Sequence, residues 1–459
     1  MGSVRRDWTA LAALGLLAGL AMTPSPCSGQ GIQDEVFRVY TDAPRLFLRP
    51  QRLRLLRREK DRQSLRWQQL QLLMTGKAQM PEPGFANALY YQISGDKSYG
   101  ETAIDWAMGR STDLRQLALV LDWCGKLLSE AQAKALAAKL EQGLAQSESA
   151  TDTAVVRSRV LAALALADRN PDLAESVLRK TVVTWWRGSI VPAIAAGRNP
   201  IPVDRMFALV ELLHAIRDNL NIELRDNAPQ YFKTLAPSWM LSAYPAPYPA
   251  AENLYRIPVY EGGGEPDLEK AALARAAGLS LVSYDTNALE NQFLQGWLIQ
   301  DRYLMRSAFG SPYEFLWANP YQPGLTYYHM PLFFHDAESG RLFVRSSWED
   351  DAVWFGLFNH HSQIFEDGKV RELGPGGPAE PVHLGVATIV PAARATRFTV
   401  DEQEPETIYI IGLKANARYD IEVDSQEMHE SVADAAGTLE LRFPAALKAG
   451  VRIHPAGGS

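Results

Sequence analysis

This chain of 459 residues has two cysteines, no net positive charge and few long apolar runs. Of its two cysteines, Cys27 lies close to the N-terminus, which leaves Cys124 without a partner for a disulfide. The fold must therefore rest on its apolar core, which a chain of this length can readily build. The 46 lysines and arginines against 53 acidic residues give a net charge of −7. This balance argues against nucleic acid as a partner, because there is no basic field to collect phosphates.

The first thirty residues have the pattern of an export signal. Arg5 and Arg6 precede the apolar run Leu11–Met22, and small or turn-forming residues follow it. About a dozen apolar residues are too few to cross a bilayer, which takes roughly 20. We therefore expect a signal peptide over residues 1–30, cleaved near its end, and a periplasmic or secreted protein.

The route of export stays open. The paired arginines would suit a twin-arginine route, although Asp7 follows them directly and the rest of that motif is missing. Cys27 would suit lipid attachment, but Pro26 stands where that reaction requires a small residue. No other segment is long and apolar enough to cross a membrane, so we expect no membrane span in the mature chain.

Apolar residues recur every three or four positions from Pro50 to about Leu220, which predicts a series of amphipathic helices. The separators are short and rich in Ser, Thr, Asp, Gly and Pro, the residues that begin and end helices. Short connections between helices of similar length predict antiparallel hairpins. Such a series can form an open solenoid, a closed toroid or a plain bundle. We favour the toroid, because an open solenoid would need polar capping repeats.

From Leu304 onwards, short runs rich in β-branched and aromatic residues alternate with turn sequences such as ESG, EDG and KAG. Runs of this length and spacing predict an antiparallel β-sandwich. The intervening segment Tyr244–Pro266 contains prolines that exclude a continuous helix. We therefore expect an α+β multidomain protein, with an (α/α) toroid over residues 40–300 and an antiparallel β-sheet domain over residues 301–459.

Four motifs resemble segments of the heparinase II/III-like polysaccharide lyases and the alginate-lyase-like proteins, and they occur in the same order. They are PRLFLRPQRLRLLRR from Pro44, ALYYQISGDKSYGETAIDWAM from Ala88, LALVLDWCGKLLSEAQ from Leu117 and FVRSSWEDDAVW from Phe343. Each motif is short, but together they extend over most of the chain. The resemblance implies a helical toroid followed by an antiparallel β-sheet domain. It also implies cleavage of uronic-acid polysaccharides by β-elimination.

β-Elimination needs a group that neutralises the uronate carboxylate, a base for the C5 proton and an acid for the leaving oxygen. The resemblance implies Asn, His or Arg for the first task, and Tyr and His for the others. His214 is the one histidine of the helical half, and Arg217 and Asn219 follow it. We expect His214 to be catalytic, and Arg217 and Asn219 to bind substrate. The other interpretation is a histidine hydrogen-bonded at a contact between helices.

The proline-broken segment supplies the tyrosines Tyr244, Tyr248, Tyr255 and Tyr260. A cation next to a tyrosine favours its phenolate, which singles out Tyr255 and its neighbour Arg256. We expect Tyr248 and Tyr255 to be catalytic. We expect Tyr244 and Arg256 to bind substrate. The other interpretation is that these rings pack the segment onto the rim of the toroid.

Fewer candidates come from the C-terminal half. His360 and His361 stand where the resemblance to the lyases fades, and adjacent strand residues face opposite ways, so only one of them can face the toroid. We expect His360 to take part in catalysis, and His329 and the flat ring of Trp317 to bind substrate. No set of residues has the spacing of metal ligands, so we expect no metal and no cofactor.

Three functions remain open at this point. The first is an exported lyase that acts on an acidic polysaccharide or oligosaccharide, for which the binding cleft must be locally basic. The second is a catalytically inactive relative that binds glycans or a cell-envelope partner, since the histidine-and-acid segment implied after Phe358 is missing. The third is a glycoside hydrolase, which needs two carboxylates roughly 5 to 10 Å apart. The candidate carboxylates are Asp204, Asp218, Glu252, Glu261 and Glu265.

Overall fold

The computed structural model describes residues 35–251, 254–259, 265–300, 304–374, 376–395, 397–401, 406–424, 427–444 and 448–456. The expected signal peptide lies outside these ranges, and so do Tyr260, Glu252 and Glu261. The chain divides into two units after Val36, and the second unit begins at Phe37. Among its described helices, none combines the length and the apolar character that a membrane span requires.

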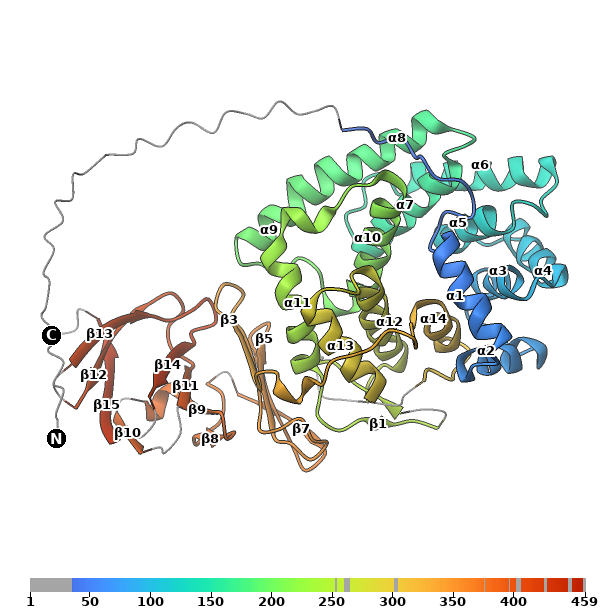
Figure 1. Cartoon of the computed structure of the whole chain (residues 1–459). Coiled ribbons are helices and arrows are strands. Elements are labelled where there is room, and N and C mark those ends of the chain that lie inside the picture. The colour runs from blue at the N-terminus through green and yellow to red at the C-terminus, as the bar shows by residue number, and fades with distance from the viewer. Residues whose placement is uncertain are drawn as a thin grey trace, which may run out of the picture. The chain divides into compact units, whose positions relative to one another are not determined.

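Helices fill the chain from Pro50 to Trp317 (Figure 1). They are α1 Pro50–Asp61, α2 Leu65–Thr75, α3 Pro83–Ser94, α4 Lys97–Met108, α5 Leu114–Trp123, α6 Glu130–Gln146, α7 Thr153–Leu166, α8 Pro171–Arg179, the π-helical η1 Lys180–Ile190, α9 Val191–Ala195, α10 Met206–Leu220, α11 Pro229–Ser242, α12 Leu268–Tyr284, α13 Leu289–Gln300 and α14 Gly310–Trp317. Short 3₁₀ turns lie at η2 Val203–Arg205, η3 Leu224–Asn227, η4 Tyr327–His329 and η5 Ala392–Arg394.

Many of these helices begin with the capping residues that the sequence predicts. Seven side chains accept a hydrogen bond from a first-turn amide, which satisfies a donor that the helix itself leaves open. They are Ser64, Asp96, Asp113, Ser129, Asp152, Asn170 and Asp267. Local sequence therefore decides where these helices begin.

Six of the described helices form a closed ring, and α8, η1 and α9, which follow one another without a gap, separate two of its members, α7 and α10. Helix α3 contacts α5, α5 contacts α7, α7 contacts α10, α10 contacts α12, and α12 contacts α14. The rings of Phe85 in α3 and Tyr313 in α14, 5.1 Å apart, close the circle. Helices α4, α6, α8 and α13 each pack against a member of this ring. The predicted (α/α) toroid is thus confirmed, and the helices continue past residue 300 as far as Trp317.

A buried charged network occupies the end of the ring at which its helices begin. Arg115 Nη2 lies 2.7 Å from Glu211 Oε1, and Arg115 Nη1 lies 3.3 Å from Glu82 Oε1. Arg157 also pairs with Glu211, and the Tyr313 hydroxyl donates to Glu82. Burial alone would raise the pKa of Glu211, but the two guanidiniums hold it below its ordinary value. Opposite charges therefore compensate one another at this end of the ring.

Two of the sequence motifs bind each other. Both oxygens of Asp122, in the DWCGKLLSE motif, accept hydrogen bonds from the backbone N–H of Arg45, and Oδ2 also accepts one from Leu46, at 2.8 to 3.2 Å. Trp123 Nε1 donates to the Leu46 carbonyl at 2.8 Å. Burial raises the pKa of Asp122 to about 6. The Asp-Trp pair therefore fixes the segment that leads into α1.

Among the described residues, the part of the chain after α14 forms three sheets, and a two-stranded ribbon, β1 Tyr248–Pro249 with β2 Leu254–Tyr255, lies between α11 and α12. The first sheet has the order β3-β4-β5-β6-β7, the second β14-β11-β9-β8, and the third β10-β15-β12-β13. The strands are β3 Phe333–Asp336, β4 Arg341–Arg345, β5 Trp354–Phe358, β6 His361–Glu366, β7 Lys369–Leu373, β8 Val382–His383, β9 Ala387–Pro391, β10 Arg397–Asp401, β11 Glu406–Ile411, β12 Arg418–Val423, β13 Glu427–Val432, β14 Leu439–Phe443 and β15 Lys448–Pro455.

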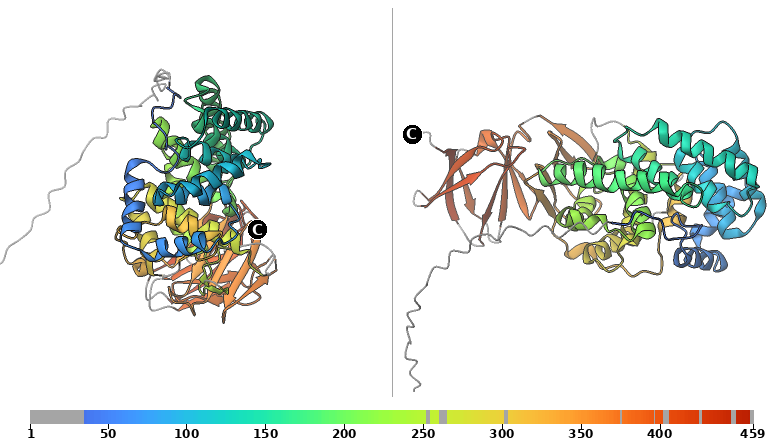
Figure 2. Two further views of the ribbon diagram at one scale, coloured as in Figure 1. Left: turned by 90° about the vertical axis from the view of Figure 1, so that its right-hand side faces the viewer. Right: turned by 90° about the horizontal axis from the view of Figure 1, so that it is seen from above.

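These sheets pack in layers, which the right-hand view of Figure 2 shows. Leu342 and Val344 of β4 face the second sheet, whereas Phe343 between them joins the core of the helical part. In the second sheet, Tyr409 faces the first sheet and Ile408 faces the third. The expected sandwich is confirmed. Among the described strand pairs, β9 and β11 run parallel and the others are antiparallel.

A histidine joins the first sheet to the second. His335 of β3 has Nδ1 2.7 Å from Glu440 of β14 and Nε2 3.0 Å from Asp434. Burial would lower the pKa of His335, but these two hydrogen bonds raise it to about 9. At neutral pH the ring is therefore an imidazolium between two carboxylates.

The RSSWEDDAVW motif connects the first sheet to the helices. Trp354 Nε1 donates to the carbonyl of Leu241, in α11, at 2.7 Å. The Arg345 guanidinium lies 4.6 Å from the ring of Trp348 and donates from Nε to the Ser347 carbonyl at 2.6 Å. These contacts hold the first sheet against α11, so the motif has a structural role.

Candidate functional site

A cavity of about 680 Å³ lies at the end of the ring opposite the charged network. It is formed where α10, α12 and α14 end and α1 begins. Its lining residues are Phe47, Arg49, Pro50, Gln51, Arg52, Leu55, His214, Arg217, Asp218, Ser283, Thr286, Trp317 and Asn319. We call it the ring pocket. Its volume is within the range of small-molecule sites, roughly 300 to 1,000 Å³.

His214 stands in the wall of the ring pocket, and its ring is held on several sides. Nε2 lies 2.9 Å from the carbonyl oxygen of Ser280 in α12. Because a carbonyl only accepts, Nε2 carries the proton and Nδ1 keeps its lone pair. The ring also lies 4.7 Å from Trp317 and 4.9 Å from Tyr284, between centroids. These contacts fix the tautomer and the orientation of the imidazole.

The environment of His214 favours the neutral imidazole. Its side chain is 5% exposed, and burial lowers its pKa well below 6.5, with Arg217 as the next cause. Arg217 Nη2 lies 3.5 Å from Nδ1, the nitrogen with the lone pair. The neutral imidazole of His214 and the fixed guanidinium of Arg217 are therefore neighbours in the pocket wall.

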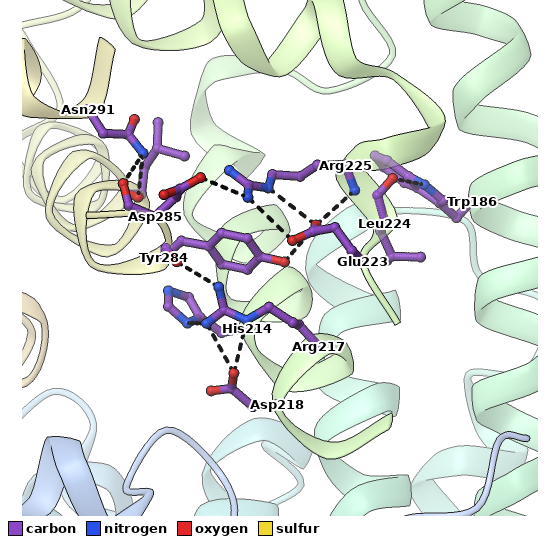
Figure 3. A network of polar contacts seen from close by, with 11 residues as sticks. Trp186, His214, Arg217, Asp218, Glu223, Leu224, Arg225, Tyr284, Asp285 and Asn291 are labelled. Atoms are coloured by element: carbon purple, nitrogen blue, oxygen red, sulfur yellow. Dashed lines mark hydrogen bonds and ion pairs between the residues drawn. The ribbon is translucent and has the colours of Figure 1, made fainter. Parts of the chain in front are cut away.

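A network of polar contacts holds Arg217 in position (Figure 3). Its Nη1 donates to the Tyr284 carbonyl at 2.6 Å, and its guanidinium lies 3.7 Å from the Tyr284 ring centroid. The Tyr284 hydroxyl donates to Glu223 at 2.8 Å, and Arg225 approaches the same ring at 4.4 Å. Arg225 in turn pairs with Asp285 at 3.1 Å. The network sets the position of Arg217 before any ligand binds.

The charge of the ring pocket is positive. Among the described lining residues there are three arginines and one carboxylate, which leaves two positive charges. That carboxylate, Asp218, lies 3.0 Å from Arg217 and 3.5 Å from Arg49. Burial lowers the pKa of Arg52 to about 10, so this guanidinium is still charged at neutral pH. The pocket is thus locally basic in a chain whose net charge is −7.

Three of the predicted site residues meet in this pocket: His214, Arg217 and Trp317. Trp317 is buried, with 1% of its surface exposed, and Arg52 Nη1 donates to its carbonyl at 3.5 Å. Asn219 is also nearby in sequence but is fully buried, and its amide donates to the Ala215 carbonyl at 2.9 Å. Asn219 therefore faces away from the pocket and supports the end of α10.

The predicted tyrosines lie elsewhere. The Tyr244 hydroxyl donates to Gln363 Oε1, in β6, at 2.6 Å, and its ring stacks on Phe365. Tyr248 donates to Glu265, and the backbone of Tyr248 pairs with Tyr255 in the small ribbon. None of these three tyrosines lines the ring pocket. For Tyr244 the interpretation as a packing residue describes the contacts better.

Tyr255 and Arg256 line a different and very small cavity. Its volume is about 30 Å³, which has room for roughly one water molecule. Tyr255 is 4% exposed, and Arg256 lies 3.1 Å from Asp350 of the RSSWEDDAVW motif. A sugar could not enter this cavity without movement of the surrounding chain.

The histidines of the C-terminal half do not reach the ring pocket either. Asn359 and His360, with φ of 47° and 64°, form the turn between β5 and β6, and both are exposed. The expectation that His360 and His361 sit together on a strand is therefore wrong, because the strand begins at His361. His329 ends the short turn η4 and is exposed.

The described carboxylates considered for a hydrolase lie in two different cavities. Among those described, Asp218 is the one that lines the ring pocket. Asp204 and Glu265 both line another cavity, of about 560 Å³. There Asp204 pairs with Arg205 at 2.8 Å, and Glu265 accepts from Tyr248. The described residues of the ring pocket thus do not offer two facing carboxylates.

Sequence reasoning missed Arg49, Arg52 and Asn319. The arginines were visible in PRLFLRPQRLRLLRR, but that motif indicated only the start of a helix. Asn319 lies two residues after Trp317, the last residue of α14, and side chains at a helix end can reach a pocket. The one signal in the sequence for a basic pocket was the group of arginines at the start of α1.

Comparisons with known proteins add a weak similarity. No family model matches the sequence, and no curated protein sequence does. The chain is similar to solved structures of two kinds of carbohydrate-active protein. Heparan sulfate lyase HepC from Pedobacter heparinus aligns at 11% identity and a TM-score of 0.36, over 82% of this chain and 76% of that one. A mutant of the same lyase aligns at 12% identity with the same coverage and TM-score.

A glycoside hydrolase aligns at 10% identity and a TM-score of 0.29, over 82% of this chain and 71% of that one. All three TM-scores lie below 0.5.

Proposed function

We propose that this protein is an exported polysaccharide lyase that cleaves a uronic-acid-containing polysaccharide in the ring pocket. The observation that supports this most strongly is the 3.5 Å distance between His214 Nδ1 and Arg217 Nη2. In a uronate, the proton to be removed is on the carbon that bears the carboxylate. A base and a carboxylate-binding cation must therefore be close neighbours, as these two groups are.

His214 is the proposed base. Its Nδ1 would take the C5 proton, the C–H electrons would form the C4–C5 double bond, and the bond from C4 to the glycosidic oxygen would break. The leaving oxygen needs a proton, and the imidazolium formed at His214 can supply it. Tyrosine is absent from the described lining of the pocket, so His214 is the group best placed for both transfers.

Arg217 is the proposed partner of the carboxylate. Charge that develops on the carboxylate during proton removal is stabilised by a guanidinium that is already in position. A bound carboxylate would also neutralise Arg217, which is one cause of the low pKa of His214. Substrate binding would thereby raise the basicity of the imidazole at the moment when a base is needed.

The direct test is incubation with heparan sulfate, alginate and pectate, with the absorbance of the unsaturated product in the far ultraviolet as the readout. Wild-type protein should release such a product from at least one of them. His214→Gln keeps a donor for Ser280 but removes the base, and kcat should fall roughly 100- to 10,000-fold. Arg217→Gln should lower kcat and raise KM together.

His360→Gln is the matched control, because this exposed histidine lies in the turn between β5 and β6. It should leave kcat unchanged. Loss of activity in His360→Gln with full activity in His214→Gln would overturn the assignment of the pocket. The absence of an unsaturated product from every uronate would overturn lyase activity itself.

Binding without turnover is the second candidate function. The absence of a separate proton donor from the described pocket lining favours it, since the three arginines are sufficient for capture of an acidic glycan. Calorimetric titration of wild-type protein with the same polysaccharides separates the two. Heat of binding without any unsaturated product would favour the binding protein.

A further inference from the structure

The outward surface of α1 carries arginines beyond the ring pocket. Arg52 and Leu55 line the pocket, and Arg58 and Arg62 follow at helical spacings of three and four residues. Residues at these spacings are neighbours on a helix surface. Arg58 and Arg62 are both exposed. A basic strip thus leaves the pocket along the helix.

A second segment runs alongside this strip. Arg52 approaches the Trp317 ring at 5.8 Å, and further along the helix Arg58 and Arg62 approach the Tyr321 ring at 4.4 and 5.5 Å. Between the two aromatic residues, Asn319 lines the pocket and accepts a hydrogen bond from the Tyr321 amide at 3.2 Å. The segment from Trp317 to Tyr321 therefore joins the pocket to the outer arginines.

Among the described residues no carboxylate pairs with Arg58 or Arg62. Glu59 lies between them in sequence, but it is buried and accepts from Ser64 Oγ at 2.9 Å. A single cation against an aromatic ring is a common stabilising contact, whereas a second like charge on the same ring adds repulsion. A bound anion would remove this repulsion.

From these contacts we infer that Arg58, Arg62 and Tyr321 form an outer subsite for the acidic polysaccharide that occupies the ring pocket. This inference rests on the proposed function for the class of ligand. Arg52 and Arg62 are ten residues apart, which corresponds to about 15 Å along a helix axis. The strip therefore exceeds a single sugar, and it binds the part of a polymer that extends out of the pocket. A short oligosaccharide that fills only the pocket does not reach it.

The test compares ligand lengths with the double variant Arg58→Ala, Arg62→Ala. The probes are heparan sulfate, alginate and pectate, each together with a disaccharide prepared from it. The variant should bind the polymer about tenfold more weakly, as expected for the loss of two exposed charge contacts. Its Kd for the disaccharide should be unchanged. Added salt should also weaken polymer binding less steeply for the double variant than for wild-type protein.

Arg110→Ala is the control, since this exposed arginine follows the end of α4 and its loss changes the charge without touching the strip. It should bind both ligands as wild-type protein does. Equal polymer affinity in wild-type protein and the double variant overturns the outer subsite and leaves the proposed function standing. A wild-type protein that binds neither polymer nor disaccharide overturns both. A lower Tm of the double variant with unchanged polymer binding assigns the arginines to stability alone.

Discussion

His335 should make stability depend on pH between neutral and alkaline conditions. Its pKa is about 9 in the folded protein, against an ordinary value of 6.5. Each unit of difference corresponds to about 1.4 kcal/mol, so the ion pairs contribute about 3 kcal/mol to the free energy of unfolding. The folded pKa is raised, so the contribution is fully present below pH 6.5 and is lost as the pH rises through 9. The side chain is 9% exposed, so solvent screens this interaction little.

The measurement is equilibrium unfolding in urea at about pH 6 and about pH 9.5, for wild-type protein and His335→Gln. Glutamine can hydrogen-bond to Asp434 or Glu440 but cannot become charged. Wild-type protein should lose about 3 kcal/mol more than the variant between the two pH values. Other titrating groups are common to both proteins and cancel in the difference. The same loss in both proteins would refute an imidazolium between the two carboxylates.

Two further substitutions test contacts that hold the architecture together. Glu211→Gln removes the carboxylate that Arg115 and Arg157 share. It should lower the free energy of unfolding, measured by urea titration, by about 3 to 5 kcal/mol. An unchanged urea midpoint would mean that the guanidiniums are solvated in the folded protein. Tyr244→Phe removes the hydrogen bond to Gln363 between the helical part and the first sheet, and should cost about 1 kcal/mol in the same assay. A larger loss would show that the hydroxyl supports more than this bond.

Helix positions could be predicted because their signals are local. Asp113 and Ser129 each cap the helix that follows them, and the same residues were recognisable in the sequence as helix starts. Strand pairing is different, since it depends on partners far along the chain. Strands β9 and β11 are similar apolar runs, and nothing in either run indicates a parallel pair.

The candidate site could be predicted only in part for the same reason. Periodicity and residue type singled out His214, and Arg217 follows it by one helical turn. The pocket, however, is completed by Arg52 and Asn319, which come from the opposite ends of the helical region. Their meeting depends on closure of the ring, which single-sequence patterns do not encode.

Closure of the ring also has a consequence for how the chain folds. The contact between Tyr313 and Glu82 joins residues 231 positions apart in sequence. Contacts of such separation form late, because the entropy of closing the loop must be overcome first. During synthesis α3 is made long before α14, so apolar rings such as Phe85 lack the contact with Tyr313 until α14 has been made. A chain that ends before Gly310 would keep that surface open permanently, and we expect it to aggregate or to need a chaperone.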